Sequence, residues 1–278
     1  MRPLDGNIDL DLDINLLDLD PAVKVLKMIY SFESWPNLLK LADTFFNRIT
    51  QIYNNYTHNN ELEIKHQRPL IYYYGYSLLM LGLAHKEIEN YDKARTYIKA
   101  YSDLSWFKGL DAEGLNEVAY YKYISEPNLL EVEVLSGNIQ FIDRYVSFLL
   151  SNTKEVLPGL ITLLKTATNF NLNIESHLEL FSNSISKFED TAADEIIINS
   201  YQETFFINMI RYKTKIQDYN TAIKYSMKLL DSAEVTNSDK IFKQAVVYFE
   251  SLRSCADATQ IKDFEEKIIN FKERVESL

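Results

Sequence analysis

The chain has 278 residues with 40 acidic and 29 basic side chains, which gives a formal net charge of −11 at pH 7. Modules that bind nucleic acid usually carry a basic face, so this charge balance argues against direct nucleic-acid binding by this chain. The single cysteine, Cys255, excludes an intrachain disulfide and fits a reducing, cytoplasmic location. The apolar runs are short and interrupted, and we expect neither a membrane span nor a secretory signal.

Turn-forming and aromatic residues point to a helical fold. The chain has 7 glycines and 6 prolines, well below average usage of about 7% and 5%. A β-rich fold would need many more turn residues, so the scarcity favours long helices joined by short polar turns. The 19 tyrosines and 15 phenylalanines suit half-buried helix faces, and an aromatic-lined peptide groove is the alternative interpretation.

The N-terminal 20 residues differ from the rest of the chain. Apolar and acidic residues alternate over 7–16, which is the period of a strand, but aspartate forms strands poorly. We therefore expect residues 1–20 to form an acidic extended arm. Asp20 and Pro21 have the residue types of an N-cap and a first helical position. They predict the start of a TPR-like helical repeat domain spanning 21–278.

Helical periodicity then continues to the end of the chain. We expect the polar stretch 54–60 to end the second helix, and Pro127 to start a short helix of its own. The predicted helices are 22–32, 35–54, 69–88, 91–104, 111–124, 127–135, 138–150, 153–168, 174–188, 191–216, one beginning at 218, 238–254 and 256–276.

One segment, residues 78–101, has the spacing of a tetratricopeptide (TPR) hairpin, W-x2-L-G-x2-Y followed by alanine. Leu78 replaces the usual tryptophan and His85 the usual tyrosine. Gly82 and Ala94 are small at the positions where two antiparallel helices would touch. Because such a hairpin cannot bury its apolar face alone, it implies stacked neighbours.

A second copy of the pattern strengthens the repeat interpretation. Tyr219, Ala222 and Tyr225 repeat the spacing of the tyrosines and alanine in 91–97. The two copies are not separated by a whole number of 34-residue periods, so the intervening units must be irregular. The sequence predicts an all-α fold, a right-handed superhelical TPR-like α-solenoid of about a dozen antiparallel helices.

The sequence contains no recognisable catalytic motif. None of the four histidines has a partner at metal-ligand spacing, and no phosphate-binding glycine loop or nucleophile elbow occurs. His85 falls at a packing position, where an interior role is expected. We therefore expect neither enzymatic activity nor a metal or cofactor.

Stacked helical arrays usually bind a ligand along their concave side, and tyrosine and asparagine side chains are suited to contact it. An asparagine amide can both donate to and accept from the backbone of an extended peptide, while tyrosine rings hold apolar side chains. The alternative is that these side chains complete helix packing or meet water. The candidate peptide-binding residues are Tyr72, Tyr73, Tyr76, Asn116, Tyr120, Asn199, Asn208 and Arg211.

Residues 68–84 and 90–95 carry a family resemblance, which continues through Trp106, Phe107 and 157–160. Over residues 21 to about 230 the chain resembles the helical C-terminal region of Gram-positive regulators that combine a Cro/C1-type helix-turn-helix with TPR-like repeats. It is more distantly similar to the peptide-pheromone receptors of the Rap, PlcR, PrgX and arbitrium-receptor type.

The resemblance implies a ligand-sensing and dimerisation domain of a cytosolic bacterial transcription regulator. Such a domain would bind a short signalling peptide, as in quorum sensing, or a protein partner in a concave groove, and would form a homodimer. Residues 1–20 are too short and too acidic for a helix-turn-helix, so DNA binding is not carried over. Two alternatives remain: a plain TPR protein-interaction scaffold, and a Rap-type modulator or phosphatase of a response regulator, for which no water-orienting residue stands out.

Overall fold

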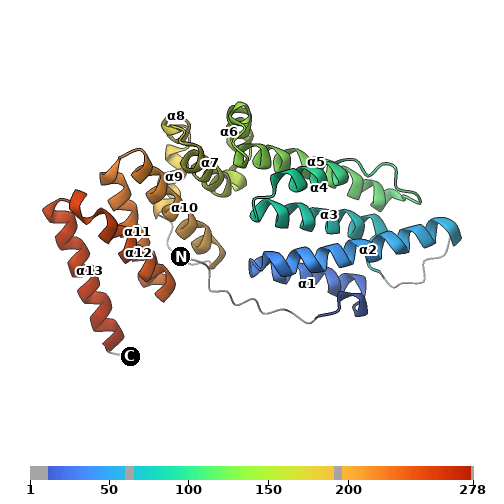
Figure 1. Ribbon diagram of the computed structural model, residues 1–278, viewed down its shortest axis with the longest axis horizontal. Helices are drawn as coiled ribbons and strands as arrows, with labels where there is room; N and C mark the ends of the chain where they lie inside the picture. Colours follow the sequence, from blue (N-terminus) through green and yellow to red (C-terminus); the bar gives the residue numbers. More distant parts are fainter. Residues whose placement is uncertain (1–11, 60–65, 191–195, 277–278) are drawn as a thin grey trace. The chain divides into compact units, whose positions relative to one another are not determined.

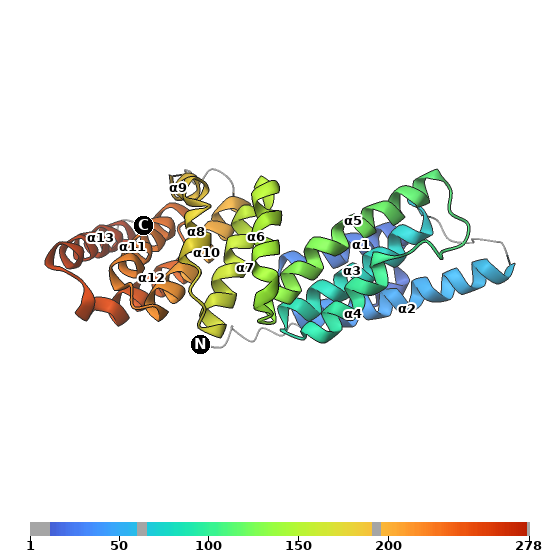
Figure 2. The same cartoon turned by 90° about the horizontal axis from the view of Figure 1, so that it is seen from above.

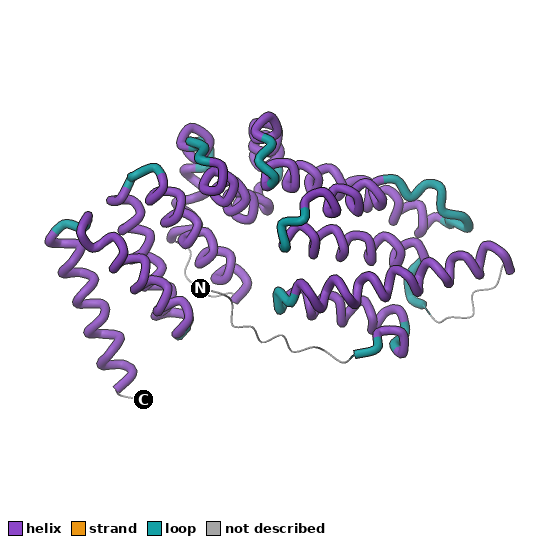
Figure 3. Tube along the Cα trace, viewed as in Figure 1, coloured by secondary structure: helices purple, strands orange, loops and turns teal. Residues whose placement is uncertain are grey.

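The computed structural model describes residues 12–59, 66–190 and 196–276, and all regular secondary structure in these ranges is helical (Figure 1). Figure 3 shows the same ranges as helices joined by short loops. The predicted all-α class is thus confirmed for the described residues. No helix in these ranges combines the length and apolar character needed to cross a bilayer. The chain divides into two compact units, residues 1–136 and 137–278.

Unit 1 is a set of antiparallel helices that pack in chain order, and α3 contacts α5 as well as α4. The helices lie side by side in both Figure 1 and Figure 2. The core includes the fully buried aromatic rings of Phe45, Tyr73, Tyr101 and Tyr121. The helices of unit 1 are α1 (Leu19–Ser31), α2 (Trp35–Asn59), α3 (Leu70–Glu87), α4 (Tyr91–Ser102) and α5 (Ala112–Leu135).

Unit 2 is built around α10, which packs against both α7 and α11, while α11 also contacts α12 and α13. Phe205, Tyr212 and Phe249 are fully buried in it. The helices of unit 2 are α6 (Ile142–Ser151), α7 (Val156–Phe170), α8 (Glu175–Glu179), α9 (Ser182–Asp190), α10 (Ile196–Lys215), α11 (Tyr219–Thr236), α12 (Asp239–Leu252) and α13 (Ala258–Glu276).

The two predicted hairpins, α3–α4 and α10–α11, have the same type of turn between their helices. Glu89 and Gln217 adopt left-handed backbone conformations, with φ of 61° and 64°. The next residues, Asn90 and Asp218, cap the following helix by accepting from the backbone N–H three positions on, at 3.3 and 3.2 Å. Their own amides donate to the carbonyl five residues earlier, at 2.8 and 2.9 Å. This is a Schellman turn joined to an N-cap, so the matching sequence patterns do mark matching local structures.

The small residues singled out by the pattern lie at helix contacts, but the tightest contact is elsewhere. Ala94 and Ala222 are fully buried. A methyl group on Gly82 would lie 3.6 Å from Cβ of Tyr97, which is ordinary van der Waals contact. A methyl group on Gly75 would instead overlap the ring of Tyr121. The glycine that α3 requires is therefore Gly75, which faces α5.

The described part of the predicted N-terminal arm, residues 12–20, includes a short 3-10 turn and the first residues of α1. Residues 1–11 lie outside the described residues, but Ile14 is fully buried in a 3-10 turn, Ile14–Leu16. The guanidinium group of Arg48 donates to the carbonyls of Ile14 and Leu17, at 3.2 and 2.6 Å. Helix α1 begins at Leu19, two residues before Pro21. Apolar packing against α2 therefore orders a segment whose sequence suggested an arm.

Three predicted helix boundaries are wrong. Helix α2 continues through the polar stretch to Asn59, and α5 runs without interruption past Pro127. Apolar residues on both sides of Pro127 are buried in unit 1, among them Tyr121 and Leu130, and this packing outweighs the lost backbone hydrogen bond. The predicted helix 174–188 is divided into α8 and α9. The predicted helix start at Thr191 lies outside the described residues.

Candidate functional site

A pocket of about 460 Å³ lies in unit 1 among α1, α3 and α5. Four of the eight predicted peptide-binding residues line it: Tyr72, Tyr76, Asn116 and Tyr120. The remaining lining residues are Lys27, Arg68, Leu79, Glu117 and Tyr121. Its volume falls within the range of about 300–1,000 Å³ that is usual for ligand sites.

Helical spacing and one close contact build this pocket. Tyr72 and Tyr76 are four residues apart on α3, as are Asn116 and Tyr120 on α5, so each pair lies on one helix face. The hydroxyl of Tyr121, which is fully buried, donates to the carbonyl of Tyr72 at 2.8 Å. Because Gly75 has no side chain, the Tyr121 ring can lie against α3, and α5 is held beside the two tyrosines of α3.

The lining is an arrangement of phenol rings. The rings of Tyr72 and Tyr76 stack with centroids 5.8 Å apart, and Tyr120 contacts Tyr121 edge-on at 5.4 Å. Burial raises the pKa of Tyr72, Tyr76 and Tyr121 above the usual value. The hydroxyl groups are thus protonated at neutral pH. They can donate as well as accept hydrogen bonds.

Two cations accompany the tyrosines. The guanidinium carbon of Arg68 lies 4.1 Å from the ring centroid of Tyr72, and the same group pairs with the buried carboxylate of Glu117. The ammonium nitrogen of Lys27 lies 5.7 Å from the ring centroid of Tyr76. Both arrangements are cation–π contacts, in which the negative face of the aromatic ring attracts the cation.

Tyr73, although adjacent to Tyr72, points into the core. Its ring is fully buried, and its hydroxyl donates to Oδ1 of Asp20 at 2.7 Å. The same hydroxyl accepts from the backbone N–H of Gln67 at 3.2 Å. Burial and the hydrogen bond to Asp20 raise the pKa of Tyr73 to about 12. Tyr73 therefore positions the segment before α3 rather than lining the pocket.

The other predicted residues belong to unit 2 and do not join this pocket. Asn208 is buried in α10, and its amide donates to the carbonyl of Thr204 one turn earlier, at 2.7 Å. The Nε of Arg211 donates to the hydroxyl of Tyr248 at 2.9 Å, which links α10 to α12. Asn199 lies in α10, but its side chain is outside the described residues. Asn208 and Arg211 thus have contacts within α10 and with α12, and the binding role predicted for them stays a prediction.

Five pocket residues were not predicted as binding residues: Lys27, Arg68, Leu79, Glu117 and Tyr121. Arg68 directly precedes the predicted start of α3, and Glu117 follows the predicted Asn116. Their sequence separation of 49 residues gives no local signal for the ion pair. In the sequence Lys27 resembles any other solvent-exposed lysine. Only the packing of α1 against α3 shows that it lines the pocket.

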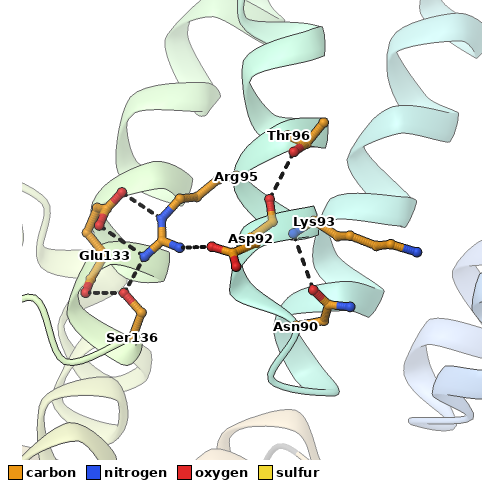
Figure 4. Close-up of polar contacts among 7 residues, drawn as sticks. All are labelled: Asn90, Asp92, Lys93, Arg95, Thr96, Glu133 and Ser136. Atoms are coloured by element: carbon orange, nitrogen blue, oxygen red, sulfur yellow. Dashed lines mark hydrogen bonds and ion pairs between the residues drawn. The ribbon is translucent and has the colours of Figure 1, made fainter.

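A second arginine, Arg95 of α4, forms a closed cluster (Figure 4). It donates to both carboxylate oxygens of Glu133, at 2.8 and 3.2 Å, and to Asp92 at 2.9 Å. It also donates to the hydroxyl of Ser136. Since all three guanidinium nitrogens have acceptors, the cluster joins α4 to the end of α5 and occupies four of the five N–H donors of Arg95.

A groove of about 510 Å³ lies between α11 and α13 in unit 2. No aromatic side chain lines it. Its lysines face carboxylates, as Lys228 does with Glu189 at 3.2 Å, and Lys267 with Asp231. The groove therefore offers a charge-balanced polar surface, without the rings that distinguish the pocket of unit 1.

Within the described ranges, no group of three or more histidine, cysteine, aspartate or glutamate side chains is placed to hold a metal ion. His85 has the interior role expected of it, because it is buried in α3 and stacks on Tyr97 with ring centroids 5.5 Å apart. Burial lowers the pKa of His85.

The chain matches no protein-family model, and no curated protein or solved structure is significantly similar to it.

Proposed function

We propose that this protein is a binding domain that recognises an extended peptide in the pocket of unit 1. The peptide would be a short signalling peptide or an exposed segment of a protein partner. The observation that carries the proposal is the position of Asn116, which is exposed beside three tyrosine rings. In the described part of the chain its amide makes no hydrogen bond to another residue.

The chemistry of this surface matches an extended peptide. Such a peptide presents unpaired backbone N–H and C=O groups, and one asparagine amide can satisfy both kinds. The rings of Tyr72, Tyr76 and Tyr120 offer an apolar surface with polar tips, which holds side chains without excluding backbone polar groups. Tyr120 is 51% exposed, so a ligand that covered it would bury new apolar area.

The proposal extends to the setting that the family resemblance implies. The domain would sense its ligand as part of a cytoplasmic bacterial transcription regulator and would form a homodimer. The hairpins would stack as a right-handed TPR-like superhelix, with the pocket on its concave side. The shared turn of α3–α4 and α10–α11 supports this arrangement, because repeated turns are typical of stacked repeats.

A peptide library screened by thermal unfolding tests the proposal. A ligand of the folded state should raise the unfolding temperature in a saturable way. For each peptide that binds, Asn116→Ala and Tyr120→Ala should weaken binding at least about tenfold, or roughly 1.4 kcal/mol. Tyr123→Ala is the matched control, because Tyr123 is a 69% exposed tyrosine on the same helix that does not line the pocket.

Two results would contradict the proposal. If no peptide stabilises the protein, peptide sensing is wrong. If peptides bind but all three variants bind equally well, the pocket is not the binding site. A folded protein partner that binds the chain while its isolated segments do not would favour the scaffold alternative.

A further inference from the structure

We propose that the peptide bound in this pocket presents a carboxylate, which Arg68 and Lys27 bind beside the tyrosine rings. This inference rests on the proposed function and names the chemistry of its ligand. The carboxylate is either an acidic side chain or the C-terminus of the peptide, since both offer the same acceptor oxygens.

The side chain of Arg68 is fixed in position, but some of its N–H donors have no acceptor among the described residues. Its guanidinium group lies over the ring of Tyr72, and one terminal nitrogen donates to Glu117. Among the described contacts, Nε and the other terminal nitrogen have no acceptor, and the side chain is 45% exposed. A guanidinium carries five N–H donors in a rigid plane. The ring and Glu117 thus fix the orientation of a donor edge that remains open to a ligand.

Glu117 orients Arg68 and does not compete with an acidic ligand. Its side chain is only 6% exposed, and its carboxylate is paired with Arg68. A buried carboxylate needs such a partner, because desolvation without one is costly. The pair is formally neutral, so the charge that the pocket offers to a ligand depends on its other residues.

Lys27 supplies the uncompensated charge. It is exposed and, in the described part of the chain, its ammonium group contacts the Tyr76 ring and no carboxylate. The nearby carboxylate of Asp20 is engaged by the Tyr73 hydroxyl and the Gln67 amide, at 2.7 and 3.1 Å. In a chain of net charge −11, this pocket joins an open arginine edge to an unpaired lysine. That charge complementarity is what selects a carboxylate.

Arg95 shows what an arginine with a purely structural role looks like in the same unit. Its three nitrogens all have acceptors, and its side chain is 23% exposed. Arg68 has one acceptor and about twice that exposure. Arg95 is therefore engaged by neighbouring side chains, whereas Arg68 retains N–H donors for a ligand.

The test uses one peptide that binds the full chain, made in three forms. These are the original peptide, a form with each acidic side chain replaced by its amide, and a form with an amidated C-terminus. One of the two neutralised forms should bind about fivefold to twentyfold more weakly, and the form that loses affinity identifies the source of the carboxylate. Raising the salt concentration should reduce the difference, since screening weakens exposed charge pairs.

Lys27→Met assigns the effect to the pocket, because it keeps most of the aliphatic stem and removes the charge. It should weaken the original peptide by about the factor that neutralisation does, and should weaken the neutralised peptide no further. Lys24→Met is the control, since Lys24 is an exposed lysine on the same helix outside the pocket. Unfolding curves of both variants confirm that the fold is retained.

The failures are distinguishable. If no peptide binds, the proposed function is wrong. If peptides bind and neutralisation changes nothing, or if Lys27→Met and Lys24→Met behave alike, only the carboxylate inference is wrong. If Lys27→Met instead abolishes self-association and leaves peptide affinity unchanged, the occupant of the pocket is a second copy of the chain, and the inference is likewise overturned.

Discussion

Helix α3 contacts α5 on one side and α4 on the other, and the two contacts differ in how closely the helices approach. On the α5 side, a methyl group on Gly75 would overlap the ring of Tyr121. On the α4 side, a methyl group on Gly82 would lie 3.6 Å from Cβ of Tyr97. The α3–α4 contact therefore has normal helix spacing and a capped turn, while the α3–α5 contact depends on the absence of a side chain. The closer contact lies beside the tyrosine pocket. The difference suggests that glycine is needed where the candidate site is built, and is optional within the repeat hairpin.

The largest predicted effect breaks the α3–α5 contact. Gly75→Ala should destabilise unit 1 by about 1–3 kcal/mol, because the added methyl group must displace a buried ring. Both tryptophans of the chain, Trp35 and Trp106, lie in unit 1. Tryptophan fluorescence during denaturant unfolding therefore reports on this unit alone.

A second substitution sharpens that experiment. In the Tyr121→Leu background, Gly75→Ala should cost less than it does in the wild-type background, because the ring that the methyl group meets is gone. Equal costs in the two backgrounds would mean that Tyr121 is not the residue that Gly75 accommodates.

The next effect concerns the turn on the α4 side. Asn90→Ala should cost about 0.5–2 kcal/mol, the usual penalty for losing an N-cap. Asp218→Ala in the matching turn of unit 2 should cost a similar amount. Circular dichroism during thermal unfolding measures both, and a cap variant without any loss would show that its turn is held by packing alone.

The two caps should differ in pH dependence. Burial opposes the ionisation of Asp218, but hydrogen bonds from Thr221 and Lys213 outweigh it and hold the pKa of Asp218 below the usual value. The stability that the ionised group adds is present above the unfolded-state pKa of about 3.9 and is lost as the pH falls through the lower folded-state pKa. The cost of Asp218→Asn should therefore shrink at acidic pH, whereas the cost of Asn90→Ala should stay constant.

A smaller effect is expected from the hydroxyl group of Tyr121. Tyr121→Phe removes the hydrogen bond to the carbonyl of Tyr72 and should cost about 0.5–1.5 kcal/mol. Tyr123→Phe is the control, because this hydroxyl is on an exposed ring of the same helix. If the two variants unfold at the same denaturant concentration, the hydrogen bond contributes nothing to the α3–α5 contact.

The smallest effect has the opposite sign. Gly82→Ala should be neutral or stabilise unit 1 by up to about 1 kcal/mol, because alanine has the higher helix propensity and the space beside Gly82 admits a methyl group. A loss as large as that of Gly75→Ala would show that α4 lies closer to α3 than the described contacts indicate.

About half of the candidate site could be predicted from the sequence. Tyr72 and Tyr76 are recognisable as one face of a helix, and so are Asn116 and Tyr120. The sequence could not distinguish Tyr72 from Tyr73, because the two residues are chemically identical neighbours. Only the neighbouring helices decide which ring is buried. Arg68 and Glu117 pair across 49 residues, a separation at which no local pattern exists.

By itself the sequence determined the all-helical class, the matching patterns at the start of α4 and α11, and the positions of most helices among the described residues. These features depend on hydrogen bonds and side-chain periodicity within a few residues. Tertiary structure decided that Pro127 stays within α5, that Ile14 is buried, and that Gly75 rather than Gly82 is the indispensable glycine of α3. Each of these outcomes depends on which distant side chain occupies the adjacent space, and packing free energy there exceeds the local preference of the chain.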